Sequence, residues 1–204
     1  LRREGVHYLN SHAVFPTVTR VNAAAIGTGA YPGTNGIVSN VMYVPAVNQG
    51  RPFNLGEFQH LVSLEAVSDG RLVLVKTLGE HLQEHALQLA VVSSGSTGSS
   101  LLLNPQARRG VGTLVNGYFD PGRLVAFPPE VNKTLLERFG PAPAKGGTSE
   151  PHQAAVDWTE DVLREFILPE LRPDVVVNWL TEPDHMQHAF GAGQAQDRVH
   201  RVLH

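Results

Sequence analysis

The chain has 204 residues, of which 42% are hydrophobic, so it can bury a substantial core and a disordered chain is excluded. Its formal net charge of −3 provides no broad positive field, which argues against nonspecific binding to nucleic-acid polymers or anionic lipid. Cysteine is absent, which excludes disulfides and thiolate metal ligands, and no apolar run approaches the roughly 20 residues of a membrane-spanning helix.

Helices and strands are predicted to alternate along the chain. In chain order, the predicted elements are the end of a helix running into an extended segment at 1–9, an Ala-rich helix at 21–26, a strand at 71–75, an amphipathic helix at 78–86, a strand at 87–93, a helix at 156–168 and a strand at 173–180. Pro169 is expected to end the last helix. The final strand is a continuous apolar run, as in strands buried on both faces. This alternation favours α/β layers with a largely parallel sheet.

Residues 94–149 are richer in Gly, Pro and Ser and less periodic than the rest of the chain. They are predicted to form loops with short strands, or an insertion. Within the Ser-rich stretch, "SSGSTGSS" lacks the lysine of a phosphate-binding P-loop and the pattern of a serine-hydrolase elbow. A flexible loop is the prediction for it.

The segment "PTVTRVNAAAIGTG" places a hydroxyl and an amide near the start of a predicted helix. A hydroxyl such as that of Thr19 can attack an electrophile there, because the exposed N–H groups and positive end of the helix favour an anionic substrate. Asn22, one turn further on, can donate to a phosphoryl oxygen. The alternative is that Thr19 caps the helix and Asn22 satisfies a turn.

A second polar cluster, "NWLTEPDHMQHAFG", follows the last predicted strand. Ligands of open α/β sheets gather at such strand ends, and Asp184 lies there. His188 follows four residues later, so in a helical turn the two side chains share one face and could hold a single ion. His185 would point elsewhere. Asp184 acting only as a helix N-cap is the alternative.

Together, these segments resemble the type I phosphodiesterase and nucleotide pyrophosphatase family of the alkaline phosphatase superfamily. In that family a threonine, two further residues and an asparagine precede a short helix that ends at Thr-Gly. The spacing from Asn22 to the Thr-Gly pair at 28–29 matches the family with Thr19, not Thr17, as the nucleophile. "EPDHMQHAFG" is similar to the family's aspartate, three residues, histidine segment. Asn35 departs from the family, in which histidine is common before Gly-Ile.

The resemblance implies an α/β fold, an alkaline-phosphatase-like layered sandwich with a largely parallel central sheet that is incomplete at both ends. It implies a hydrolase of small-molecule phosphoesters, in which Thr19 attacks phosphorus to give a phosphothreonine that water then hydrolyses. Asn22 would bind a nonbridging phosphoryl oxygen. Two divalent metal ions, expected to be Zn²⁺, would stabilise the attacking and leaving oxygens, with Thr19, Asp184 and His188 among their ligands.

The same resemblance implies further metal ligands outside this stretch: an aspartate upstream, and an Asp-His pair and a histidine downstream. Asp197 and His200 lie too close to the predicted site histidine to take these roles. We therefore expect residues 1–204 to be a single partial catalytic domain, with a loop-rich insertion in its middle. Glu182 and His185 are expected only to support the metal ligands. The family resemblance suggests an extracytoplasmic or periplasmic location.

A competing motif is "HLQEH", which matches the inverted zinc-peptidase pattern with His81 and His85 one helical turn apart and Glu84 between them. The alternative is the solvated face of an amphipathic connector. A further hypothesis is a noncatalytic fragment that lacks a full metal site. No pattern in the sequence fixes the oligomeric state.

Overall fold

A four-stranded sheet lies at the centre of the molecule. The computed structural model of the chain describes residues 4–6, 8–117, 125–143, 152–182 and 184–191. The strands of the sheet are β3 (Leu89–Ser93), β4 (Thr113–Asn116), β5 (Val125–Phe127) and β6 (Val175–Trp179), in the order β5-β4-β3-β6. Strand β3 pairs in parallel with β4 and with β6, whereas β5 is antiparallel to β4. The prediction of an α/β fold with a largely parallel sheet is confirmed.

Helices connect the strands and cover the sheet. The α-helices are α1 (Thr19–Thr28), α2 (Pro32–Asn35), α3 (Phe58–Val67), α4 (Leu78–Glu84), α5 (Thr97–Leu103), α6 (Pro129–Phe139), α7 (Gln153–Val162) and α8 (Asp184–Phe190). A 3₁₀ turn spans Ala107–Arg109, and a π-helix, Leu163–Leu171, extends α7. A small ribbon pairs β1 (Val41–Met42) with β2 (Phe53–Asn54). Among the described residues, no helix has the length and apolar character needed to cross a membrane.

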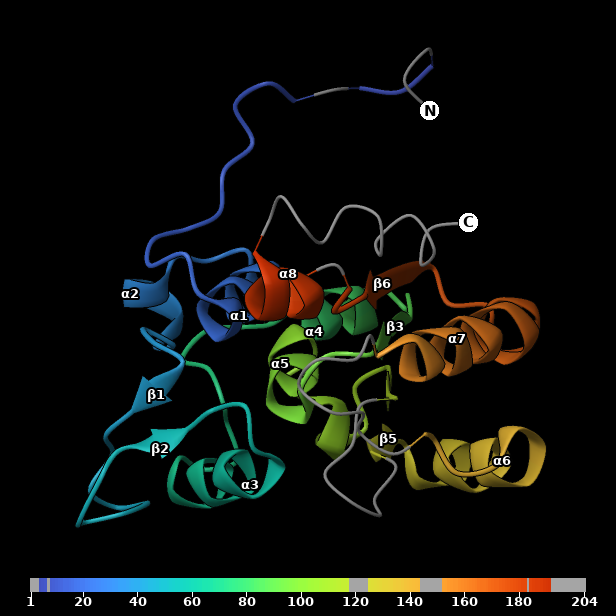
Figure 1. Cartoon of the computed structure of the whole chain (residues 1–204). Coiled ribbons are helices and arrows are strands. Elements are labelled where there is room, and N and C mark those ends of the chain that lie inside the picture. The colour runs from blue at the N-terminus through green and yellow to red at the C-terminus, as the bar shows by residue number, and fades with distance from the viewer. Residues whose placement is uncertain (1–3, 7, 118–124, 144–151, 183, 192–204) are drawn as a thin grey trace.

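The two faces of the sheet bury separate cores, because side chains alternate along a strand. On β3, Leu89 and Val91 belong to one hydrophobic cluster with residues of α1 and α5. Ala90 and Val92, on the other face, belong to a second cluster with residues of α6 and α7. Figure 1 shows α1, α4 and α5 on one side of the β3 and β6 region, and α6 and α7 on the other. The predicted layered sandwich is therefore the observed architecture.

Residues 71–75, predicted as a strand, form a series of bends instead. A strand would alternate buried and exposed side chains, but the neighbours Leu72 and Val73 are both buried and Leu74 is exposed. The Leu74 N–H donates to the Asn35 carbonyl oxygen at 3.0 Å, outside any sheet. The prediction is wrong because this apolar run reaches the core as bent chain rather than by pairing with another strand.

The predicted strand at 173–180 is present as β6, but it is not buried on both faces as expected. Its residues are only half-buried, and Asn178 is exposed. The reason is its position: β6 is the outer strand of the sheet in the described part of the chain, and β3 is its only neighbour there.

Pro169 does not end its helix, because the π-helix continues through Leu171. In a π-helix each N–H bonds the carbonyl oxygen five residues earlier, so the bond that Pro169 cannot make is the one to Arg164. The next carbonyl oxygen, on Glu165, accepts a hydrogen bond from the guanidinium of Arg138 at 3.2 Å. This bond connects α6 to the helix near the proline.

The stretch 94–149 contains more regular structure than its composition predicts. It includes helices α5 and α6 and the sheet strands β4 and β5. The Ser-rich segment is not a flexible loop, because it forms the start of α5, whose seven residues are all buried. Whether part of this stretch is an insertion stays a prediction.

Helices α1 and α5 approach each other closely at Gly27. A Cβ atom added there would lie 2.8 Å from the Leu103 carbonyl oxygen and closer still to that of Leu102, both of them rigid backbone atoms. We expect Gly27→Ala to lower the free energy of unfolding by about 1–3 kcal/mol, because overpacking outweighs the better helix propensity of alanine. Urea denaturation followed by circular dichroism measures this change.

The matched control is Gly33→Ala in α2, where an added Cβ meets nothing within 4 Å. Here only helix propensity changes, so stability should stay the same or rise by about 1 kcal/mol or less. If Gly27→Ala is as stable as the control, the close packing of α1 against α5 is not required for the fold.

Candidate functional site

The parallel strands β3 and β6 end side by side, with Ser93 opposite Trp179. The residues after each strand therefore meet at one edge of the sheet, which is where ligands of open parallel sheets bind. A pocket of about 160 Å³ lies at this edge. Its walls come from the start of α1, the turn between β3 and α5, the residue before α7, and the segment that leads from β6 into α8.

Two hydroxyl residues fasten the segment after β6 to the segment after β3. The Ser94 hydroxyl accepts a hydrogen bond from the Thr181 N–H at 3.1 Å, and the Thr181 hydroxyl donates to the Ser94 carbonyl oxygen at 3.1 Å. The Ser94 N–H also donates to the Trp179 carbonyl oxygen at 3.1 Å, which prolongs the ladder by one residue. These bonds fix the direction in which the chain enters α8.

The turn between β3 and α5 is held by the buried amide of Asn116, at the end of β4. Its Nδ2 donates to the Gly95 carbonyl oxygen at 2.6 Å and to the Ser100 hydroxyl at 2.8 Å. Its Oδ1 accepts from the Thr97 hydroxyl at 3.1 Å. Because buried polar groups are costly unless they are paired, this network holds the pocket wall after β3 in one conformation.

Thr19 and Arg20 bring α1 to the pocket. Thr19 is the first residue of the helix, and the N-cap is Val18, which forms no side-chain cap. The alternative interpretation of Thr19 as the helix cap is therefore wrong. The Arg20 N–H donates to Asn40 Oδ1 at 2.9 Å, and its Nη2 donates to the Ser96 hydroxyl at 3.2 Å. The helix start thus places a hydroxyl and a positive charge in the wall of the pocket.

Asn22 lies one turn into α1, and the structure gives its side chain a local partner. Oδ1 accepts from the Val14 N–H at 2.9 Å, and Nδ2 donates to the Val18 carbonyl oxygen at 3.0 Å. Asn22 thus fastens the loop before α1, as the turn alternative expected. It is not among the residues that line the pocket. A contact with a phosphoryl oxygen stays a prediction.

Asp184 and His188 lie one turn apart on α8 and line the pocket with Thr19. Asp184 Oδ1 and His188 Nε2 are 3.6 Å apart, and their side chains are 73% and 81% exposed. The shared helix face that the spacing predicts is present. Imidazole nitrogen and carboxylate oxygen are both zinc ligands, so this open pair has the chemistry to hold an ion.

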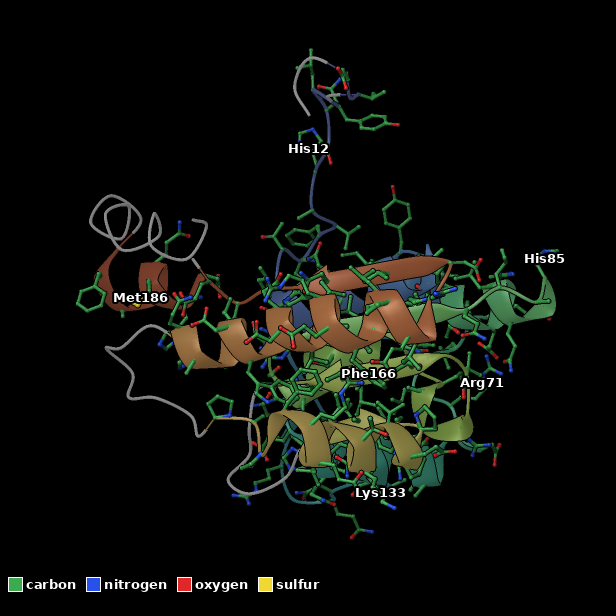
Figure 2. The ribbon with its side chains drawn as sticks, turned by 90° about the vertical axis from the view of Figure 1, so that its right-hand side faces the viewer. His12, Arg71, His85, Lys133, Phe166 and Met186 are labelled. Carbon is green, nitrogen blue, oxygen red and sulfur yellow. The ribbon has the colours of Figure 1, made fainter. Side chains whose placement is uncertain are left out.

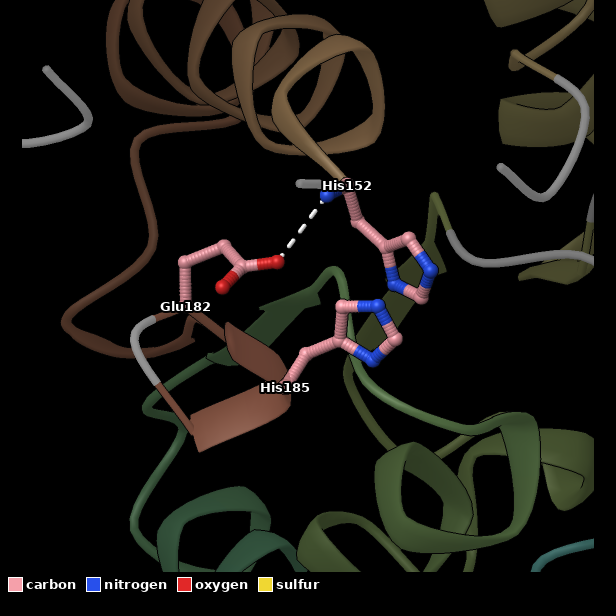
Figure 3. A group of neighbouring side chains, drawn as sticks. All are labelled: His152, Glu182 and His185. Carbon is pink, nitrogen blue, oxygen red and sulfur yellow. Dashed lines mark hydrogen bonds between the residues drawn. The ribbon is translucent and has the colours of Figure 1, made fainter. Parts of the chain in front are cut away.

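A group formed by His152, Glu182 and His185 lies beside this pair (Figure 3). Glu182 and His185 were expected to support the metal ligands, whereas His152 was not singled out from the sequence. One ligand atom of each lies within 4.8 Å of the others. The His152 and His185 rings stack, with centroids 3.8 Å apart and an interplanar angle of 21°. His185 was expected to point elsewhere than Asp184 and His188, yet it lines the same pocket, as does His152.

The "HLQEH" motif lies elsewhere on the molecule. His81 and Glu84 are on α4, His85 is the C-cap, and all three are exposed and outside the pocket lining. Figure 2 shows His85 at the opposite end of the molecule from Met186 of α8. A hydrogen bond from Lys76, 2.5 Å away, lowers the pKa of Glu84, which makes it a weaker base. The geometry favours a solvated connector over a peptidase site.

The solved structures that share the fold include two of phosphonoacetate hydrolase from Sinorhizobium meliloti 1021. The complex with phosphonoformate matches with a TM-score of 0.59 at 20% identity, and the complex with phosphonoacetate with 0.53 at 22%. Each match covers 94% of this chain and 42% of that chain, so the chain spans less than half the length of the hydrolase. This likeness shows the fold alone. No curated protein matches the chain.

The sequence also matches a family model over nearly its whole length. The family is described as type I phosphodiesterase / nucleotide pyrophosphatase, and the match spans residues 1–203. Both segments that carry the resemblance, at 19–29 and 182–191, lie inside it. The chain therefore belongs to the type I phosphodiesterase / nucleotide pyrophosphatase family.

Proposed function

We propose that the protein is a metal-dependent phosphoester hydrolase, that residues 1–204 are a partial catalytic domain of it, and that Thr19 is its nucleophile. One observation carries the proposal: Thr19, near the amino end, lines the same pocket as Asp184 and His188, near the carboxyl end. The family of the chain supports the reaction class. Small phosphoesters are the proposed substrates, because the solved structures that share the fold hold the small phosphonates phosphonoformate and phosphonoacetate.

In the proposed reaction, the Thr19 oxygen attacks phosphorus in line with the leaving oxygen. The bond from phosphorus to the leaving oxygen breaks, and the leaving group takes up a proton as the Thr19 hydroxyl loses one. A phosphorylated threonine forms, which keeps the second ester group when the substrate is a diester. Water then attacks phosphorus, the bond to the Thr19 oxygen breaks, and the hydroxyl is restored. Arg20 adds positive charge to the same pocket wall, which favours binding of an anionic phosphoryl group.

Asp184 and His188 fit a divalent cation, because they offer an oxygen and a nitrogen ligand on one helix face and both side chains are largely exposed. When bound, two zinc ions would supply Lewis-acid stabilisation to the attacking and leaving oxygens. Thr19 is proposed to be both the nucleophile and a ligand of a metal ion at this site. Asn22 is proposed to bind a nonbridging oxygen, which requires its amide to exchange a loop carbonyl for the phosphoryl group.

A direct test measures hydrolysis of bis(p-nitrophenyl) phosphate and p-nitrophenyl phosphate by the protein that contains this sequence. His188→Gln should lower kcat/KM by about 10- to 100-fold, and chelation should remove activity that added Zn²⁺ restores. Comparing kcat/KM for the diester with kcat/KM for the monoester shows which phosphoester class is preferred.

The matched control is His60→Gln. His60 also faces a carboxylate on its own helix, with Nδ1 3.4 Å from Glu57 Oε2, but it lies outside the pocket. Its replacement should leave turnover unchanged. Equal activity in the two variants, or activity that survives chelation, would exclude the proposed metal role of His188.

A further inference from the structure

We propose that His152, Glu182 and His185 form an additional metal site, which binds Zn²⁺ separately from the Asp184 and His188 pair. Their ligand atoms lie within 4.8 Å of one another, close enough to surround one ion after small side-chain adjustments. Two imidazoles and one carboxylate are a set that proteins use for zinc with a fourth position left open. His152 and His185 also line the pocket.

The burial of Glu182 and His152 is evidence that the group binds a cation. Glu182 is 4% exposed and His152 is 5% exposed. A carboxylate that is removed from water is costly unless a positive charge compensates it. Within the described part of the chain, no lysine or arginine forms an ion pair with Glu182. A metal ion between the carboxylate and the two imidazoles would provide the missing charge.

Hydrogen bonds hold the carboxylate of Glu182 in place, and they leave lone pairs of its oxygens available for a metal ion. One oxygen accepts from the His152 N–H at 2.9 Å, and the other accepts from the Met186 N–H at 3.4 Å. Each carboxylate oxygen has a second lone pair, so both remain able to bind an ion. Figure 3 shows the Glu182 carboxylate directed at the His152 backbone N–H, with the His152 and His185 rings lying next to each other.

Binding requires one local movement. Ring nitrogens bind metals in the plane of the ring, and the stacked His152 and His185 rings, 3.8 Å apart, direct their nitrogens side by side rather than toward one point. Rotation of one imidazole about its Cβ–Cγ bond corrects this, and that torsion is broad in histidine. His185 is only half-buried and lines the pocket, so it is the ring with room to turn.

The site is distinct from the proposed catalytic pair. Successive residues of a helix are rotated by about 100°, so His185 leaves α8 on a different face from Asp184 and His188. An ion at His152, Glu182 and His185 would tie the start of α7 to the start of α8. It would thereby hold α8, the helix that carries the pair, in place. This effect would add to that of any ion bound by Asp184 and His188.

The test uses the protein that contains this sequence, with Asp184→Asn and His188→Gln so that the proposed catalytic pair no longer competes for metal. Zn²⁺ affinity is measured by competition with a chromophoric chelator. We expect Glu182→Gln or His185→Gln, added to this background, to weaken the binding of one Zn²⁺ equivalent at least about tenfold. Glu182→Gln keeps the size of the side chain and an acceptor oxygen, and circular dichroism confirms that each variant is folded.

Two further readouts separate this site from surface binding. Ring proton signals of His152 and His185 should shift together when Zn²⁺ is added, whereas those of His81 should not. His81→Gln, an exposed histidine on α4, is the matched control and should bind zinc as before. Unchanged affinity in folded Glu182→Gln and His185→Gln, or equal loss in the control, would overturn the proposal. Neither result depends on whether the protein hydrolyses phosphoesters.

Discussion

Replacing Thr19 by alanine is expected to lower kcat for phosphoester hydrolysis by about 10⁴-fold or more, because no other group then forms the covalent intermediate. The fold should be retained, since Thr19 does not cap its helix and is only half-buried. Steady-state turnover of bis(p-nitrophenyl) phosphate measures the loss. Intact-protein mass spectrometry after rapid acid quenching should detect one added p-nitrophenyl phosphoryl group on the native protein, or one phosphoryl group when the monoester is the substrate, and neither on Thr19→Ala.

Thr17→Ala is the matched control, because it removes the same methyl and hydroxyl two residues earlier from an exposed position. It should retain turnover, whereas Thr19→Ser, which keeps a hydroxyl at the helix start, should retain part of it. If Thr17→Ala is inactive and Thr19→Ala is active, the register of the nucleophile segment is wrong. Equal activity in both alanine variants would exclude a threonine nucleophile in this loop.

The part of the site that sequence could predict lies at strand ends. The apolar run before Asp184 indicated a strand, and parallel strands bring their carboxyl ends to one edge. The i, i+4 spacing of Asp184 and His188 then fixed their shared face. Thr19 was placed by the spacing between Asn22 and the Thr-Gly pair at 28–29. All of these signals are local in the sequence. The residues that they identify, Thr19, Asp184 and His188, all line the pocket.

His152 could not be found in this way. It comes before α7, and it meets Glu182 only because two segments that lie 30 positions apart along the chain pack together. No spacing rule links the two residues. Glu182 and His185 were visible in the sequence as neighbours of Asp184, but their own grouping depends on that long-range contact.

The Ser-rich helix α5 was missed for a different reason. Serine, threonine and glycine favour caps and turns, because their side chains or flexible backbones compete with helix formation. Here those hydroxyls are satisfied by buried partners instead, as when Ser100 donates to Ser93 Oγ at 2.9 Å. Tertiary hydrogen bonds therefore override a weak local preference, and no single-sequence pattern contains them.

Asn116→Ala is expected to give the largest loss of stability, about 3–5 kcal/mol in the free energy of unfolding. Asn116 is fully buried, and the truncation leaves the Gly95 carbonyl oxygen and the Thr97 hydroxyl without the partners they have now. Each unsatisfied buried polar group costs about 1–3 kcal/mol, and the small cavity adds to this. Urea denaturation measures the change from the shift of the midpoint at constant slope.

Asn178→Ala is the matched control, because Asn178 also lies in a strand but is exposed and donates to Glu160 at 2.7 Å. Water can replace that bond, so the control should lose less than about 1 kcal/mol. A loss in Asn116→Ala no larger than in the control would show that the turn after β3 does not depend on the buried amide. If the loss is as expected, the amide of Gly95 in that turn should also exchange its hydrogen before the amides of β3, because the pocket wall is then the least stable part of the sheet edge.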